Sequence, residues 1–391
     1  MTTSTSIGVG IADHARGFAS GREAALQARA ELGPQAISLA LLFSSHPDAD
    51  QVLKGARSVL GNVPLIGATT GGQYSHQGYA EQGAGVMLIH STSIRFHLVN
   101  RQRAWVGGER LLADLQGLSA GGLGNAFRHR TLMLFPDDQS MSLDGIVEKA
   151  LAETAMLYDI LGGPGQSGRK TPYPSAVFHN DHLFRMGLSG TEVLSQLPLG
   201  LSLAHGWMPF PKAYRITEAD AHMVFSIDGR ATREVYEDFL RENNIVYTNE
   251  TLPDTLLRYP LGICREGVCK VNILRRFDAN GALHMTSPPR TGSVVHFFSS
   301  RSDSMIMAAT RSIQQATDLM KNVQQAGALL IDCTGNGVIL GETYRQQRAA
   351  IQENLPNVPF LGIRSHGVLA RLQNQTAGHY ECSVATCILP A

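Results

Sequence analysis

The chain has 391 residues, of which 43% are hydrophobic, and its formal net charge is zero. This length and hydrophobic content exceed what one hydrophobic core normally serves, so they predict two domains. Zero net charge excludes the electrostatic footprint of a protein that binds nucleic acid or that is held on anionic lipid. Small molecules and other proteins remain as the expected partners.

The apolar runs and the cysteines of the sequence indicate the cellular compartment of the protein. No apolar run approaches the ~20 residues of a membrane helix and no signal-peptide pattern is present, so we expect a cytoplasmic protein without membrane insertion. Five cysteines are an odd number, which favours reduced thiols. Cys264 and Cys269 face each other if residues 266–267 form a hairpin turn, whereas Cys382 and Cys387 lie on opposite faces of a strand. Small buried or cross-strand cysteines are therefore favoured over the alternative, a zinc site.

The amino-terminal part alternates strands and helices. Strands are predicted at 6–11, 37–43 and 64–67, and helices at 19–32 and 49–60. This is the order of a βαβ unit, whose continuous apolar strands are covered on both faces. Thr69, Thr70 and Gly71 directly follow the third strand, where an open α/β sheet usually presents backbone amides to a ligand. A plain turn is the alternative.

A second glycine-rich loop follows further along the chain. Residues 131–135 read as a buried strand, 142–153 as a helix capped by Ser142, and 160–168 as a strand that opens into the loop containing Gly163 and Gly165. We expect this loop and residues 69–72 to open toward one cleft. Neither loop matches a phosphate-binding motif.

The stretch 198–232 predicts a hinge between two halves of the chain. Residues 199–203 read as a strand that stops at His205, because Pro209 and Pro211 cannot continue a central strand. A strand at 221–227, an Asp-Gly turn and a helix at 232–243 follow. The predicted domains are therefore 1–207 and 208–391.

The second half also mixes helices with strands. An antiparallel meander is predicted at 262–277 with 283–285, and a strand at 293–298. The longest helical pattern covers 303–325, a strand at 328–332 carries Cys333, a helix covers 342–354, and strands at 360–363 and 383–389 close the chain. The expected fold class is α/β, with two mixed-sheet domains and flanking helices.

The order of several blocks resembles FIST proteins, which are bacterial sensory-input proteins. The blocks are PLIGATTGGQYSHQG, LGGPGQSGRK, an HGW corner followed by a proline and an IDG turn, LLIDCTGNG and VPFLGIRSHG. The resemblance covers nearly the whole chain and implies a FIST N domain followed by a FIST C domain. It further implies a non-enzymatic sensory protein that binds a small molecule or gas and signals in trans to a histidine kinase or a cyclic-dinucleotide enzyme.

Candidate ligand-binding residues follow from these blocks. They are Thr69, Thr70, Gly71, Gly163, Gly165, His205, Trp207, Cys333, Asn336 and Arg364. Two family charges are absent, because Asn336 stands near the usual arginine and Val368 replaces a glutamate. A zwitterionic amino acid is therefore a poorer ligand here, since both of its charges would be desolvated without partners.

Two further hypotheses rest on histidine and cysteine. A subgroup of FIST proteins binds haem and reports nitric oxide, and His366 and His205 are the candidate iron ligands in this chain. A histidine at a strand end more often hydrogen-bonds the backbone. The alternative function is a cysteine-dependent enzyme that uses Cys333 as nucleophile with His366 or His205 as base. No protease, esterase or nucleotide-binding motif supports catalysis.

Overall fold

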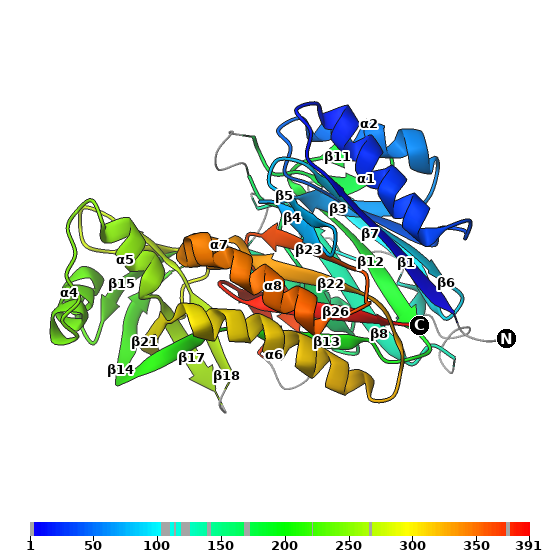
Figure 1. Ribbon diagram of the computed structural model, residues 1–391. Coiled ribbons are helices and arrows are strands. Elements are labelled where there is room, and N and C mark those ends of the chain that lie inside the picture. Colours follow the sequence, from blue (N-terminus) through cyan, green and yellow to red (C-terminus); the bar gives the residue numbers. More distant parts are fainter. Residues whose placement is uncertain are drawn as a thin grey trace.

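The computed structural model describes the chain except residues 1–3, 103–109, 113–114, 119–125, 139–141, 168–172, 221, 266–267 and 373–375. The described residues form a body, from residues 4–204 and 301–391, and a lobe, from residues 207–300 (Figure 1). In Figure 1 the lobe projects to the left of the body.

Three six-stranded sheets build the body. The first has the order β1 (Thr5–Ala12), β6 (Ala84–Ser91), β2 (Leu39–Ser44), β3 (Leu65–Thr69), β10 (Val177–His179) and β11 (His182–Phe184). The second has the order β7 (Ile94–Gln102), β12 (Gly187–Ser195), β8 (His129–Pro136), β9 (Asp159–Gly162), β24 (Val368–Arg371) and β25 (Gly378–Tyr380). The third has the order β13 (Gly200–Ala204), β26 (Val384–Pro390), β22 (Gln325–Cys333), β23 (Phe360–Ser365), β4 (Gln73–Ser75) and β5 (Gly78–Ala80).

The three sheets repeat one pattern. In each sheet the third and fourth strands are parallel and the other neighbours are antiparallel. The hairpin at the end of each sheet comes from a different third of the chain than the parallel strands that it extends. These hairpins are β10–β11 in the first sheet, β24–β25 in the second and β4–β5 in the third. The register repeats as well, because a glycine opposes a leucine in every parallel pair, as Gly67–Leu42, Gly162–Leu134 and Gly362–Leu330. The body is therefore pseudo-threefold.

Helices cover the outer faces of these sheets. Helices α1 (Gly17–Leu32) and α2 (Ala49–Leu60) pack on the first sheet, α3 (Leu143–Glu153) on the second, and α6 (Ser302–Met320) and α8 (Tyr344–Asn354) on the third. Helix α7 (Thr334–Leu340) follows β22, and short 3-10 helices lie at Gln116–Leu118 and Gly341–Thr343. The inner faces share one core, to which all three sheets contribute. Strands buried on both faces explain the continuous apolar runs of the sequence.

The lobe is one antiparallel sheet with two covering helices. Its strand order is β18 (Val268–Asn272), β17 (Leu261–Arg265), β21 (Val294–Ser300), β14 (Trp207–Ala219), β15 (Met223–Ile227), β20 (Leu283–Met285) and β19 (Leu274–Phe277), with β16 (Arg230–Ala231) beside β15. Helices α4 (Thr232–Glu242) and α5 (Leu252–Arg258) pack on it, and the rings of Phe239 and Phe297 stack with centroids 4.2 Å apart. The lobe therefore has a core of its own.

The predicted α/β fold class is confirmed, but the sheets do not follow the predicted halves. The lobe begins at Trp207, close to the predicted division at 207/208. Strands β22 to β26 nevertheless return to the body, where they pair with β13, β9 and the β4–β5 hairpin of the first half. Residues 208–391 thus supply both the lobe and about a third of the body.

The predicted strand does end beside His205, but the two prolines are not what ends it. Strand β13 ends at Ala204, but β14 runs through Pro209 and Pro211. Around these prolines β14 pairs only with β21, through a register shift between Pro209 and Ala213, and β15 joins it only from Ile216 onward. One side of the strand therefore has no neighbouring strand at the prolines. Because proline lacks an N–H group, it is tolerated there without the loss of a hydrogen bond between strands.

The cysteines depart from the prediction of reduced thiols. Cys264 and Cys269 face each other across β17 and β18, as predicted, and they form a disulfide. The predicted turn at 266–267 lies outside the described residues. Cys333, Cys382 and Cys387 are free and buried. Within the described residues, no group of three or more His, Cys, Asp or Glu side chains is placed to hold a metal ion, and no helix is long and apolar enough to cross a membrane.

The close approach of the parallel strands predicts that Gly162→Ala is strongly destabilising. A Cβ at Gly162 would overlap the carbonyl oxygen of Leu134 in β8, so the strand pair would have to separate. We expect a loss of at least ~2 kcal/mol in the free energy of unfolding, measured by urea denaturation. Gly165→Ala is the control, because a Cβ there would meet its nearest atoms at 3.4 Å, and equal losses in both variants would contradict the argument.

Candidate functional site

Three loops meet at the carboxyl ends of the three parallel strand pairs. The first loop (69–72) follows β3, the second (163–167) follows β9, and the third (364–367) includes the end of β23. Equivalent backbone groups connect them in a ring. The N–H of Gly71 donates to the Arg364 oxygen (2.7 Å), that of Gln166 to the Thr69 oxygen (2.9 Å), and that of His366 to the Pro164 oxygen (3.4 Å). The two predicted glycine loops therefore lie side by side, with the third loop beside them.

Side chains fill the space inside this ring. A Cβ at Gly71 would press on Gln166 and Thr334, and one at Gly163 would press on Ser365. Thr334 donates its hydroxyl to Gln166, while Thr69 is buried and exchanges hydrogen bonds with the backbone of Ala176. Thr70 is also buried and accepts a hydrogen bond from Gln73, and Gly165 donates its N–H to Pro136. These contacts hold the three sheets together, and a ligand role for these loop residues stays a prediction.

Asn336 and Arg364 belong to a buried polar cluster beside the ring. Asp332, at the end of β22, accepts hydrogen bonds from Asn336 (2.8 Å), the Tyr344 hydroxyl (2.8 Å) and the Gln347 amide (2.7 Å). Arg364 donates to the Tyr79 hydroxyl (3.1 Å), and its guanidinium lies 5.1 Å from the Tyr344 ring centroid. Burial raises the pKa of Asp332 to about 6, against the opposing effect of its three donors.

Cys333 lies at the start of α7 and contacts another thiol. Its side chain is 5% exposed and is hydrogen-bonded to Cys382, which lowers the pKa of the Cys333 thiol. Both cysteines belong to a small cluster that includes Trp207 and Phe298. In the part of the chain that the structure describes, no histidine ring bonds to Cys333. The arrangement is that of a packed thiol pair without a general base.

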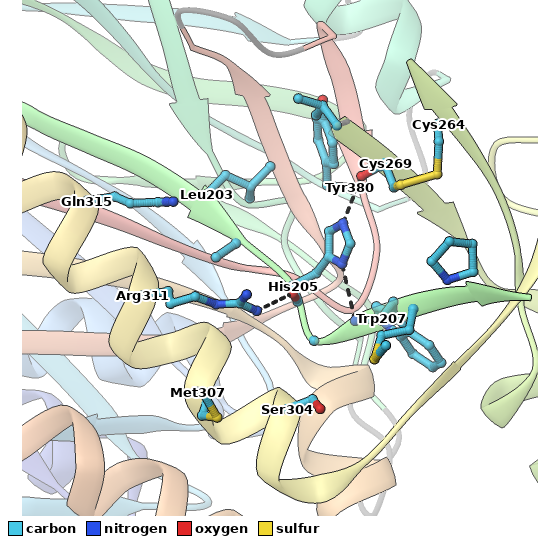
Figure 2. Close-up of a pocket in the computed structure, with 15 residues that line it drawn as sticks. Leu203, His205, Trp207, Cys264, Cys269, Ser304, Met307, Arg311, Gln315 and Tyr380 are labelled. Carbon is cyan, nitrogen blue, oxygen red and sulfur yellow. Dashed lines mark hydrogen bonds between the residues drawn. A yellow bond between two sulfur atoms is a disulfide. The ribbon is translucent and has the colours of Figure 1, made fainter. Parts of the chain in front are cut away.

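A cavity of about 720 Å³ lies where the body meets the lobe. We call it the junction cavity (Figure 2). The body supplies Leu203, Tyr380 and one face of α6, with Met307 and Arg311, and the lobe supplies the start of β14 and the disulfide hairpin β17–β18. Most of the wall is apolar. A few polar groups on an apolar wall are typical of a small-molecule site.

His205 and Trp207 line this cavity, as their predicted ligand role requires, but the His205 ring is engaged. Its Nε2 donates to the Cys269 oxygen (2.9 Å), and its Nδ1 accepts from the Trp207 N–H (3.2 Å). Burial lowers the pKa of the imidazole, which keeps the ring neutral. Arg311 donates to the His205 carbonyl at 3.0 Å. His205 therefore connects α6 to the disulfide hairpin through the hydrogen bonds of its carbonyl and its ring.

His366 lies apart from the junction cavity. Its Nε2 accepts from Arg275 at 2.8 Å, and its carbonyl accepts from His379. Burial and the adjacent Arg275 lower the pKa of His366 to about 4. Both ring nitrogens of His205 and the Nε2 of His366 are thus engaged, and His366 does not line the junction cavity. This geometry does not fit an axial haem ligand, and haem binding stays a prediction.

Sequence reasoning missed several residues of the junction cavity. Met307 and Arg311 lie on α6 and Tyr380 lies in β25, both far along the chain from His205. The one available signal was the helical pattern of α6, in which Met307 and Arg311 are four residues apart and share a face. Nothing local to Tyr380 indicates its position, because β25 has only three residues.

The pKa of Asp332 predicts a pH-dependent contribution to stability. Its folded value of about 6 lies above the ordinary value of 3.8, so the folded protein binds the proton more tightly. This stabilisation is present below about pH 4 and is lost as the pH rises through 6. In urea denaturation, the wild type should lose up to about 3 kcal/mol relative to Asp332→Asn between pH 4 and pH 7. Parallel pH profiles of the two proteins would contradict this.

Comparisons with known proteins identify the family of the chain. The model of the FIST N domain matches residues 38–230, and that of the FIST C domain matches residues 233–370. Uncharacterized proteins of Mycobacterium bovis and Mycobacterium tuberculosis are each 21% identical over 389 residues, which covers 95% of this chain and 96% of theirs. The two family models together span most of the chain, which therefore belongs to the FIST family of sensory-domain proteins.

Proposed function

We propose that this FIST protein binds a small ligand in the junction cavity and passes the signal to a partner protein. The observation that carries the proposal is the cavity itself. Its volume of about 720 Å³ lies within the range of roughly 300–1,000 Å³ that small-molecule sites occupy. FIST domains are sensory domains, and a sensor needs a site of this kind.

The cavity wall favours an amphipathic ligand. Leu203, Trp207 and Met307 offer apolar surface, which suits an apolar ligand body. Arg311 provides the charge. Its guanidinium makes no ion pair among the described residues, and it donates to the His205 carbonyl. An acidic group on the ligand would pair with Arg311, so the proposed class is an apolar molecule with one acidic group.

Ligand binding at this place would bias the position of the lobe. One wall belongs to the body and the other to the lobe, so a ligand that touches both has different affinity for different lobe positions. Such differential affinity is what shifts a conformational equilibrium. The output would pass in trans to a histidine kinase or a cyclic-dinucleotide enzyme, as the family resemblance suggests.

We propose no catalytic role for the chain. Cys333 is buried against Cys382, and the two histidines suggested as its base hydrogen-bond elsewhere. A thiolate nucleophile needs a base or a cationic neighbour and access to substrate. The enzyme hypothesis would require a rearrangement of this packed cluster.

Filling the junction cavity should abolish ligand binding. Met307 lines the cavity and is 58% exposed, so Met307→Trp adds volume without disturbing a core. Ligands that raise the melting temperature of the wild type in a screen of apolar acids should lose that effect in this variant. Leu319→Trp is the matched control, because Leu319 lies on the same helix, is 50% exposed and does not line the cavity. Hits that survive in Met307→Trp would place the ligand elsewhere.

The haem and nitric oxide hypothesis has a direct spectroscopic test. Because the imidazole nitrogens of His205 and the Nε2 of His366 are engaged, we expect haem reconstitution to give no absorption band that depends on either residue. Spectra of the wild type, His366→Ala and His205→Ala measure this. A band that only one variant loses, with unchanged circular dichroism, would assign the iron ligand and support the gas-sensor function.

A further inference from the structure

A second cavity, of about 860 Å³, lies on the other face of the disulfide hairpin. Strands β17 and β18 pair in register, with Cys264 opposite Cys269 and Ile263 opposite Lys270. Successive residues of a strand point to opposite faces, so the cysteines line the junction cavity while Ile263 and Lys270 line the second cavity. Its remaining wall comes from the start of α3 and residues 376–377 of the body, and from residues 219–220 and the segment 286–293 of the lobe.

Two buried polar side chains of this second cavity lack partners. Asn272 is 3% exposed and Ser287 is 8% exposed, and both line the cavity. The Asn272 Oδ1 and the Ser287 Oγ have no hydrogen-bond partner within the described protein. Leaving buried polar atoms unpaired costs about 1–3 kcal/mol each. Both oxygens are shielded from solvent in this conformation, so a ligand that donates hydrogen bonds at this end recovers that cost when the two side chains turn toward it.

The charges of the second cavity leave one cation unpaired. Lys270 pairs with Asp144 at 2.5 Å, and Arg290 pairs with Glu148 at 3.0 Å. Arg265 also lines the cavity, is exposed, and has no ion pair in the described part of the chain. Asp220 also lines the cavity without an ion pair in that part of the chain, but its Oδ1 already accepts hydrogen bonds from the backbone N–H groups of His222 and Met223. Arg265 is therefore the cation that is available to an anionic group on the ligand.

We propose that the second cavity binds a hydroxylated organic anion, such as a sugar acid or a sugar phosphate. Its acidic group pairs with Arg265, and its hydroxyl groups donate to Asn272 and Ser287. Arg265 lies directly across from Val268, and Val268 is four residues from Asn272 in β18. Arg265 and Asn272 are therefore separated by about 13 Å along the strand. A ligand of several hydroxyl-bearing carbons, together with the arginine side chain, spans this distance, whereas a simple carboxylate does not.

This site is separate from the site of the proposed function, because the two cavities share no lining residue. The test is isothermal titration of the full chain with D-gluconate and with glucose 6-phosphate. Glucose, which lacks the charge, and acetate, which lacks the hydroxyl groups, are the comparison ligands. We expect at least one of the two hydroxylated anions to bind, and the comparison ligands to bind at least tenfold more weakly.

Variants assign the binding to the second cavity. Arg265→Ala and Asn272→Ala should each weaken the affinity for the bound anion at least tenfold. The Asn272 Oδ1 has no partner to lose, and Arg265 is exposed, so Arg265→Ala keeps its melting temperature even if Asn272→Ala does not. Arg276→Ala, an exposed arginine of the same lobe outside the cavity, is the control and should bind normally.

Three results would overturn the proposal. One is the absence of binding by both hydroxylated anions to the wild type. Another is equal binding of glucose and gluconate, which would remove the role of Arg265. The third is unchanged affinity in Arg265→Ala and Asn272→Ala. Met307→Trp, which blocks the junction cavity, should keep the gluconate or sugar-phosphate affinity, so failure of one site does not imply failure of the other.

Discussion

The ring of three backbone hydrogen bonds between the loops is the constraint on which the body depends. Gly71, Gln166 and His366 each donate a backbone N–H to a carbonyl oxygen of another repeat. In each case the acceptor residue lies two positions after the glycine of the fourth strand of its sheet. These bonds fix the direction in which the three sheets meet, which apolar contacts between the sheets alone do not. The exchanged hairpins add backbone pairing between the repeats. Because of these connections, the three loops 69–72, 163–167 and 364–367 are tightly packed and hold the sheets in place.

The proposed ligand site lies where the repetition is interrupted. In the first repeat β1 is followed directly by α1, whereas in the third repeat the whole lobe lies between β13 and α6. The insertion leaves β13 and α6 facing the lobe, and the junction cavity forms between them. His205 occupies this corner and joins α6 to the hairpin through its ring and its carbonyl. The site follows from the insertion rather than from the glycine loops that an open α/β sheet would use.

Local pattern was enough to predict most elements of the body, because apolar runs and helix ends are local. The α2 bounds, Ala49–Leu60, match the prediction, and the Ser142 cap is present. The hairpin exchange could not be predicted, since β4, β10 and β24 have three or four residues and pair with strands more than a hundred residues away. The sequence does carry the repeat, as LIG, ILG and FLG before the three loops. Composition favoured reduced thiols, but the register of Cys264 and Cys269 decided the pairing.

The disulfide hairpin links the two cavities physically. Its inner end is held to the body by Lys270–Asp144, and two further ion pairs cross the junction, Arg275–Glu381 and Arg290–Glu148. Of these carboxylates only Glu381 is almost fully buried, and it also accepts the Ile273 N–H, so the Arg275 pair is the costliest to break. The exposed Arg290 pair contributes little. The Arg275 pair, the Trp207–Cys382 hydrogen bond and the two chain crossings at 204–207 and 300–302 hold the lobe on the body. A shift of the hairpin against the body would change the widths of both cavities, because the hairpin is a wall of each.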